Sequence, residues 1–376
     1  MGKVKFLCLS TAMALFCAAA LGAAWTTKRL TRADGYAHQP AVAISGANIY
    51  VVWWNYYSTG DDEICFRKST DSGATWQSSK RLTYNAGDSM YPAIAVSGLN
   101  VYVVWKDDTL GNTEIYLRKS GDGGATWQSS KRLTTNAGDS FLPAIAVSGA
   151  NVYVAWSDNT PGNYEIYFKK STDGGATWKT AQRLTNNTGS SYSPDIKVNG
   201  ANIYVVWCDY TTSDIYFRKS TDSGATWNTF KQLTATSGRS WSPALAVNGA
   251  NIYMVWCDET PGNWEIYLRK STSYGATWQT AQRLTNNSGI SMHPAIAVSG
   301  TNIYVMWGDN TPGQYELYFR KSANSGATWQ TAQRLTNKTG ASEYPAIAVN
   351  NANVYVVWEY EYFEGGYSIF LKYSPL

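Results

Sequence analysis

The sequence predicts an all-β fold, a seven-bladed β-propeller of four-stranded antiparallel blades in which an N-terminal strand closes the last blade. The main observation is an internal repeat. The pattern Pro-Ala-Ile-Ala-Val-x-Gly-x-Asn-x-Tyr-Val-x-Trp recurs with little change and ends at Trp53, Trp105, Trp156, Trp207, Trp256, Trp307 and Trp358. These tryptophans are 49 to 52 residues apart. A repeat of roughly 40 to 50 residues built from short alternating strands is typical of propeller blades.

Each repeat contains four expected strands, which we illustrate with the third copy. Residues 143–148 and 151–156 alternate apolar and polar side chains and are rich in β-branched residues, as strands are. A turn through Pro161-Gly162 then leads to a third strand at 165–171. A fourth strand is expected within 178–185, which ends in Arg-Leu-Thr. Consecutive strands joined by short turns predict an antiparallel meander.

The closure of the ring is predicted from a count of strand types. The first three strands occur seven times, but the last copy ends at Leu376 without a fourth. Residues 25–31, Trp-Thr-Thr-Lys-Arg-Leu-Thr, match the fourth strands of the other copies. We therefore expect this N-terminal segment to complete the C-terminal blade, because a closed ring leaves no open sheet edge.

The first 24 residues have the order of a secretory signal peptide. Lys3 and Lys5 precede an apolar stretch at 6–21, and the small residues of 22–24 follow. We expect the mature chain to be a single propeller domain, residues 25–376, that is secreted or associated with the cell surface. No other apolar run approaches the ~20 residues of a membrane helix.

Charge and cysteine content exclude several classes of function. Without the two leader lysines the 31 basic residues fall to 29 against 27 acidic ones, a net charge of +2, which gives no field suited to nucleic acid. The mature chain keeps Cys65, Cys208 and Cys257, an odd number that predicts buried free thiols rather than a disulfide framework. Cys17 lies in the leader after the bulky Phe16, which argues against a lipid-anchor motif.

A second motif lies between the third and fourth strands. Residues 69–76 read Ser-x-Asp-x-Gly-x-x-Trp, and the motif recurs at 120–127, 171–178 and 220–227. Two further copies carry Ser273 and Asn324 at the acidic position. In a hairpin the Asp accepts backbone N–H groups, the Gly adopts positive φ and the Trp packs the turn. We expect a folding device rather than a ligand site.

This motif is the Asp-box, and over its whole mature length the chain resembles the Asp-box (BNR-repeat) propellers of the sialidase superfamily. The resemblance implies a propeller fold and, for true sialidases, an arginine triad that clamps the substrate carboxylate, a task suited to bidentate guanidinium groups. One of those arginines belongs to an Arg-Ile-Pro type motif at the start of an inner strand. The seven corresponding tripeptides here contain no arginine. Sialidases also have six blades, so the chain departs from the family twice.

Those seven tripeptides nevertheless hold the most informative variation in the chain. They precede each first strand, where the central funnel of a propeller opens, and they read His-Gln, Met-Tyr, Phe-Leu, Tyr-Ser, Trp-Ser, Met-His and Glu-Tyr before the proline. Aromatic faces with a few polar groups suit sugar rings or an extended peptide. The competing interpretation is that large irregular residues merely fill the taper of the funnel. The predicted ligand-binding residues are His38, Gln39, Tyr91, Phe141, Tyr192, Trp241, His293, Glu343 and Tyr344.

A set of repeated carboxylates is a further candidate. Asp158 and its counterparts stand two residues after the strand-two Trp, and Glu165 and its counterparts begin strand three. Pairs of carboxylates perform acid–base catalysis or bind calcium, but an Asp that opens such a turn more often caps its own backbone. We favour the turn role, since catalysis needs two carboxylates in unequal environments. The seventh repeat departs most, because 359–364 read Glu-Tyr-Glu-Tyr-Phe-Glu near Glu343 and Tyr344.

The sequence thus favours a secreted, noncatalytic binding propeller that recognises a glycan or an extracellular peptide at the funnel mouth. The first alternative is an exo-acting, sialidase-like glycoside hydrolase with a rearranged site. The second is a structural platform at the cell surface. No catalytic residue, metal site or cofactor is predicted, and the protein is expected to be a monomer.

Overall fold

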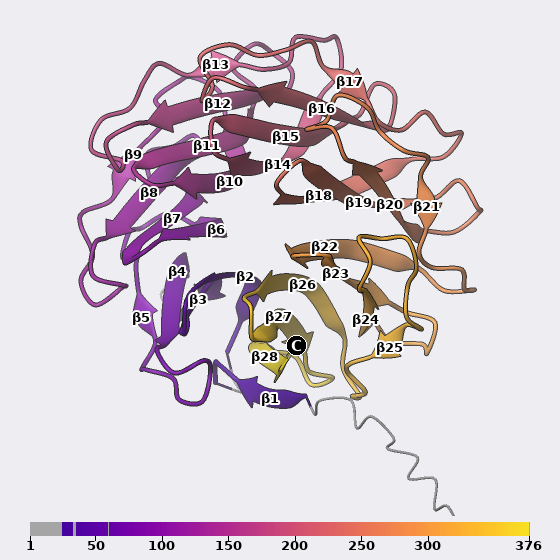
Figure 1. Cartoon of the computed structure of the whole chain (residues 1–376). Helices are drawn as coiled ribbons and strands as arrows, with labels where there is room; N and C mark the ends of the chain where they lie inside the picture. The colour runs from indigo at the N-terminus through magenta and orange to yellow at the C-terminus, as the bar shows by residue number, and fades with distance from the viewer. Residues whose placement is uncertain (1–24, 33–34, 59, 376) are drawn as a thin grey trace, which may run out of the picture.

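The protein folds as a closed ring of seven blades around a central axis (Figure 1). The structure is a computed structural model and describes residues 25–32, 35–58 and 60–375, so the predicted signal peptide at 1–24 lies outside the described residues. Within these ranges every sheet has four strands in antiparallel order. This confirms the predicted fold class.

Blades 1 to 3 follow one another along the chain. Their strands are β2 (Ala37–Ser45), β3 (Asn48–Tyr56), β4 (Asp62–Ser69) and β5 (Lys80–Arg81); β6 (Ser89–Ser97), β7 (Asn100–Asp107), β8 (Glu114–Ser120) and β9 (Lys131–Arg132); and β10 (Ser140–Ser148), β11 (Asn151–Asp158), β12 (Glu165–Ser171) and β13 (Gln182–Arg183).

Blades 4 to 6 repeat the same order. Their strands are β14 (Ser191–Asn199), β15 (Asn202–Asp209), β16 (Asp214–Ser220) and β17 (Lys231–Gln232); β18 (Ser240–Asn248), β19 (Asn251–Asp258), β20 (Glu265–Ser271) and β21 (Gln282–Arg283); and β22 (Ser291–Ser299), β23 (Asn302–Asp309), β24 (Glu316–Ser322) and β25 (Gln333–Arg334).

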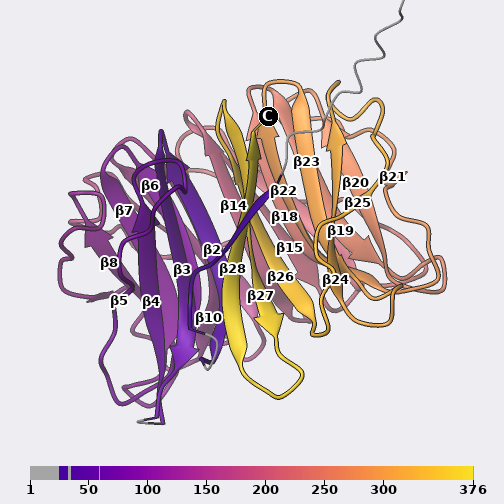
Figure 2. The same cartoon turned by 90° about the horizontal axis from the view of Figure 1, so that it is seen from below.

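Blade 7 joins the two ends of the chain. It consists of β26 (Ser342–Val349), β27 (Asn353–Glu361), β28 (Tyr367–Pro375) and the N-terminal strand β1 (Thr26–Arg29), in the sheet order β1-β28-β27-β26. Figures 1 and 2 both show β1 beside β28. Thr26 pairs with Tyr373 and Arg29 with Phe370, so the predicted closure is confirmed.

The outermost strands are shorter than predicted. In blade 3 the expected segment 178–185 yields only β13, in which Gln182 and Arg183 pair with β12. The Leu184 N–H still donates to Ile166 O at 2.7 Å. Lys179, Thr180 and Ala181 are exposed, so water can bond to their backbone groups where no ladder partner is present, whereas Leu184 and Thr185 are buried.

The core is divided among the seven interfaces between neighbouring blades. Between blades 3 and 4, for example, Phe168 and Leu184 of one blade pack against Ile203 and Trp207 of the next. The second strands carry most of this core, since β11 is buried on both faces from Val152 to Asp158. Each blade is a sheet covered on both sides, so no blade buries its apolar faces alone.

The Asp-boxes lie at the hairpins between third and fourth strands and form the expected hydrogen bonds. The backbone N–H of Thr75 donates to the Asp71 carboxylate at 2.8 Å, and the N–H of Gly73 donates to Ser69 Oγ at 2.9 Å. Gly73 has φ 91°, which a side chain would disfavour. In the two divergent copies Ser273 and Asn324 accept the equivalent bonds. The hydrogen bonds are those of a folding device.

Cys65, Cys208 and Cys257 are free and buried, as predicted. Burial raises the pKa of Cys65 to about 11 and that of Cys257 to about 12. Among the described residues no helix is long and apolar enough to cross a membrane.

Candidate binding site at the central cavity

Each blade begins with a β-bulge that sets the direction of the side chains at the funnel mouth. In blade 3, Phe141 pairs with Ser157 and Ala144 pairs with Ala155, so Leu142 and Pro143 together face one residue of β11. The same register shift occurs at the start of the first strand in every blade. Bulges of this kind redirect a side chain at the edge of a sheet.

The residue before the proline has a positive φ in all seven blades. The values lie between 47° and 54° for Gln39, Tyr91, Leu142, Ser193, Ser242, His293 and Tyr344. Positive φ is uncommon for a residue with a side chain and costs of order 1–3 kcal/mol. The fold therefore maintains a strained backbone at one equivalent position seven times, and this position faces the axis.

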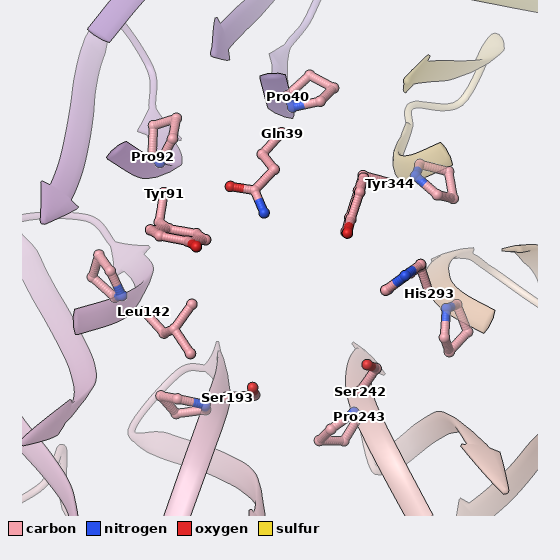
Figure 3. Close-up of a pocket in the computed structure, with 14 residues that line it drawn as sticks. Gln39, Pro40, Tyr91, Pro92, Leu142, Ser193, Ser242, Pro243, His293 and Tyr344 are labelled. Atoms are coloured by element: carbon pink, nitrogen blue, oxygen red, sulfur yellow. The ribbon is translucent and has the colours of Figure 1, made fainter. Parts of the chain in front are cut away.

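These seven residues and their prolines line a central cavity of about 350 Å³ (Figure 3). The side chains of Gln39, Tyr91 and Tyr344 point into the cavity, Tyr91 and Tyr344 from opposite sides with Gln39 between them. The other lining side chains are Leu142, His293 and the hydroxyls of Ser193 and Ser242. The wall thus combines aromatic surface with donors and acceptors. No arginine occurs among these described lining residues.

The structure divides the predicted binding residues into two groups. Gln39, Tyr91, His293 and Tyr344 line the cavity, whereas His38, Phe141, Tyr192, Trp241 and Glu343 stand one residue earlier and lie beside it. The two groups differ because adjacent residues of a strand point in opposite directions, so the residue directly before the proline faces the cavity and the residue before it does not.

Phe141, Tyr192 and Trp241 form a run of aromatic rings together with Tyr164, Tyr210 and Trp264 from the loops between second and third strands. We call these six residues the aromatic arc. Ring centroids are 5.8 Å apart between Phe141 and Tyr192, 4.7 Å between Tyr192 and Tyr210, 5.7 Å between Tyr210 and Trp241, and 5.2 Å between Trp241 and Trp264. The arc runs along the mouth over blades 3 to 5.

The junction of blades 7 and 1 is acidic. His38 Nδ1 lies 3.0 Å from Glu359 Oε1, and the ring of His38 stacks on Trp54. Glu343 lies close by, and its pKa is raised by partial burial and by the carboxylates of Glu359 and Glu361. We call Glu343, Glu359 and Glu361 the acidic sector.

Two cavity residues beside the acidic sector have shifted pKa values as well. Burial lowers the pKa of His293, although Glu359 opposes this shift. Burial also raises the pKa of Tyr344, and the neighbouring carboxylates add to the increase. His293 and Tyr344 pack against each other with ring centroids 4.4 Å apart. Both groups therefore favour their neutral forms, as hydrogen-bonding partners of an uncharged ligand do.

The repeated carboxylates lie within the framework. Asp158 Oδ1 accepts the Thr160 N–H at 2.9 Å, and Oδ2 accepts hydrogen bonds from Trp156 Nε1 and Ser140 Oγ. Burial raises its pKa, but these bonds outweigh burial and leave it lowered. Glu165 is fully buried and pairs with Arg183 at 2.7 Å. These contacts agree with the turn role favoured above and with ion pairing by the Arg-Leu-Thr segments.

Sequence reasoning missed several residues at the mouth. Leu142, Ser193 and Ser242 line the cavity. Their position directly before a proline was the sequence feature that could have identified them as lining residues. Tyr164, Tyr210 and Trp264 come from loops that the repeat pattern assigned only to a turn. The Tyr367 ring contacts His38, with centroids 4.2 Å apart, and its hydroxyl donates to Glu361 at 2.9 Å.

Comparison with known proteins bears on the fold. No family model and no curated protein matches the chain. The solved structure of the Hadza microbial sialidase Hz136 superposes with a TM-score of 0.54 at 12% identity over 88% of this chain and 74% of the sialidase. Polysaccharide lyase Uly1 superposes with a TM-score of 0.62 at 9% identity over 90% of both chains. A protein of unknown function from Dyadobacter fermentans gives 0.56 at 12% over 93% and 99%.

Identities this low establish the fold alone. The Asp-box hydrogen bonds recur from blade to blade, and two sialidase structures superpose on 88% and 80% of the chain. The chain is therefore a seven-bladed Asp-box β-propeller with a sialidase-like fold.

Proposed function

We propose that this protein is an exported, noncatalytic propeller that binds a neutral glycan at the central cavity. The observation that carries the proposal is the convergence of seven pre-proline side chains on one cavity of about 350 Å³. That volume falls within the range of small-ligand sites. Tyr91 and Tyr344 offer aromatic faces, while Gln39, Ser193, Ser242 and His293 offer hydrogen bonds, which together suit a sugar ring. The rest of each blade differs little from one repeat to the next, so the differences between repeats are concentrated where a ligand would lie.

Electrostatics favour an uncharged ligand. The described residues that line the cavity include no arginine or lysine to accept an anionic sugar, and the acidic sector repels negative charge. Without a guanidinium clamp an acidic sugar forgoes charge-assisted hydrogen bonds worth about 1.5–3 kcal/mol each. The structural neighbours named as a sialidase and a polysaccharide lyase support carbohydrate as the ligand class, but their own substrates do not transfer at such low identity.

A glycan array probed with the chain from residue 25 tests this function. We expect binding to neutral glycans. Tyr91→Ala and Tyr344→Ala should each weaken it by about 1–3 kcal/mol, the loss typical of an aromatic anchor. Tyr84→Ala is the matched control, because Tyr84 is exposed and does not line the cavity. Binding only to sialylated or uronate glycans, or only to peptides, would contradict the proposal.

One observation favours a second candidate, a glycoside hydrolase. Glu343 and Glu359 have unequal environments, since Glu359 is paired with His38 and Glu343 has a raised pKa. Such inequality is what an acid–base pair requires. Turnover of fluorogenic sialosides and neutral aryl glycosides, compared between wild type and Glu343→Gln, decides between the two functions. Activity lost in Glu343→Gln would establish the hydrolase.

A further inference from the structure

The aromatic arc lies on one side of the mouth, over blades 3 to 5, and closure of the ring does not require aromatic residues there. Two residues before the proline, blades 3, 4 and 5 carry Phe141, Tyr192 and Trp241, while the flanking blades carry Met90 and Met292. Methionine occupies the equivalent position in blades 2 and 6 of the same propeller, so the fold does not need an aromatic side chain there. Three consecutive rings, joined by three more from the adjacent loops, form a continuous and partly exposed aromatic surface, in which Trp241 and Trp264 also pack against the core between blades 5 and 6.

The arc connects two hollows. At its inner side Ser193 and Ser242, which directly follow Tyr192 and Trp241, line the central cavity. At its end Trp264 lines an outer groove of about 420 Å³ together with Glu259, Thr260 and Asn263. Between them Tyr210 leaves 51% of its surface exposed. A ligand longer than one sugar residue would thus have contact surface from the cavity to the groove.

The two charged side chains beside the arc, Arg239 and Glu259, neutralise each other. Arg239, one of two arginines that break the repeat pattern, forms a bidentate pair with Glu259 at 2.7 and 2.8 Å. Its guanidinium lies over Trp241 and Trp264, 4.7 and 5.4 Å from the ring centroids. Arg239 is therefore already neutralised and stacked. It stiffens the tryptophans rather than offering a free cation to an anionic ligand.

We propose that the aromatic arc binds the interior of a linear neutral polysaccharide, so that the cavity, the arc and the outer groove recognise several consecutive sugar residues. This rests on the proposed function and extends it from a single sugar to a chain. Pyranose rings present apolar C–H faces to aromatic rings, and their hydroxyls can meet Ser193, Ser242 and Thr260. An anionic polysaccharide would find no free cation on the arc and would meet the acidic sector across the mouth.

The test measures how affinity depends on chain length. Cello-, xylo-, manno- and laminari-oligosaccharides of two and six units are titrated by calorimetry into the chain from residue 25, with hexagalacturonate as the charged counterpart. We expect at least one neutral hexasaccharide to bind about tenfold or more tighter than its disaccharide, and hexagalacturonate to bind more weakly. Tyr210→Ala and Trp264→Ala should each weaken the hexasaccharide by about tenfold and leave the disaccharide within twofold.

Two variants serve as controls. Tyr91→Ala in the cavity should weaken both lengths alike, and Tyr274→Ala, which removes an exposed tyrosine from an Asp-box hairpin at the opposite end of the blades, should change neither. Thermal unfolding of each variant shows whether the fold is kept. Where an alanine variant unfolds, Tyr210→Ser or Trp264→Leu replaces it.

The outcomes separate the two proposals. Equal affinity for both lengths, or hexasaccharide affinity unchanged by both arc variants, overturns the arc and leaves cavity binding intact. Tighter binding of hexagalacturonate than of every neutral hexasaccharide overturns the proposal that the ligand is uncharged. Failure of the wild type to bind any of the four neutral oligosaccharide series overturns the proposed function and this inference with it.

Discussion

The closing strand can be tested against an internal standard, because the repeat supplies the same leucine in other blades. Leu30, directly after β1, is 2% exposed and packs with Val357, Ile369 and Trp53. Leu184 is also 2% exposed and occupies the same place in blade 3. Their backbone N–H groups donate to Ile369 O and Ile166 O at 2.8 and 2.7 Å. Leu30→Ala and Leu184→Ala remove equal side chains from equivalent sites.

Each substitution should lower the free energy of unfolding by about 2–5 kcal/mol, the usual loss for a buried leucine that leaves a cavity. If the closing strand is as firmly docked as an internal one, the two losses should agree within about 1 kcal/mol. Urea unfolding followed by tryptophan fluorescence measures both. The Ile369 N–H donates to Thr31 Oγ1 at 2.9 Å, so its hydrogen exchange reports separately on detachment of the strand.

A loss below about 0.5 kcal/mol for Leu30→Ala beside a loss above 2 kcal/mol for Leu184→Ala would refute the closure argument. It would mean that the N-terminal strand detaches before the ring unfolds. Deletion of residues 25–31 gives an independent check, since it turns β28 into an open edge and should cause aggregation visible by light scattering. A soluble deletion variant with unchanged unfolding would likewise mean that the N-terminal strand does not close the ring.

Three further predictions concern the framework. Hydrogen bonds from Thr75 and Ser69 lower the pKa of Asp71 to about 2. The ionised carboxylate therefore stabilises the fold above its unfolded-state pKa, and this contribution is lost as pH falls through about 2, so Asp71→Ala should reduce stability at pH 7 and have a much smaller effect below pH 2 in urea titrations. Arg183→Ala leaves the buried Glu165 carboxylate without its partner and should lower the unfolding free energy by about 3 kcal/mol, whereas a change under 1 kcal/mol would show that water replaces the guanidinium. Cys257, whose burial raises its pKa to about 12, should react with iodoacetamide only in denaturant, and rapid alkylation of the native protein would contradict its burial.

Much of the fold could be predicted because the repeat makes each inference seven times. The first strand β14 is ambiguous by itself, because it carries Asp195 and Lys197 where its counterparts have alanine. Its alignment with the other six repeats still identifies it as a strand. The end match between residues 25–31 and the internal Arg-Leu-Thr segments settled which strand β28 pairs with. Strand lengths were less accessible, since the outer strands pair over only two residues.

The site could be predicted only as far as its location. Composition marked the positions before each proline, but the bulge that turns Tyr91 inward and Trp241 sideways has no sequence signal beyond the proline itself. The loops presented a second obstacle. Tyr210 meets both Tyr192 of its own blade and Trp241 of the next blade, and a period of about fifty residues says nothing about contacts between one repeat's loop and its successor's first strand.

The seven positive φ values before the prolines limit which residues can occur in the cavity wall. A backbone of this kind accepts glutamine, tyrosine, leucine, serine and histidine, all of which occur there, but crowds side chains that branch at Cβ. Valine, isoleucine and threonine are absent from these seven positions, although they are common elsewhere in the chain. Each position is held by its own bulge, so the side chain at each of the seven positions can be replaced independently of the others. The replacements are limited to residues that are not branched at Cβ. Libraries randomised at these positions, with the three branched residues omitted, would retarget the cavity while the blades stay unchanged.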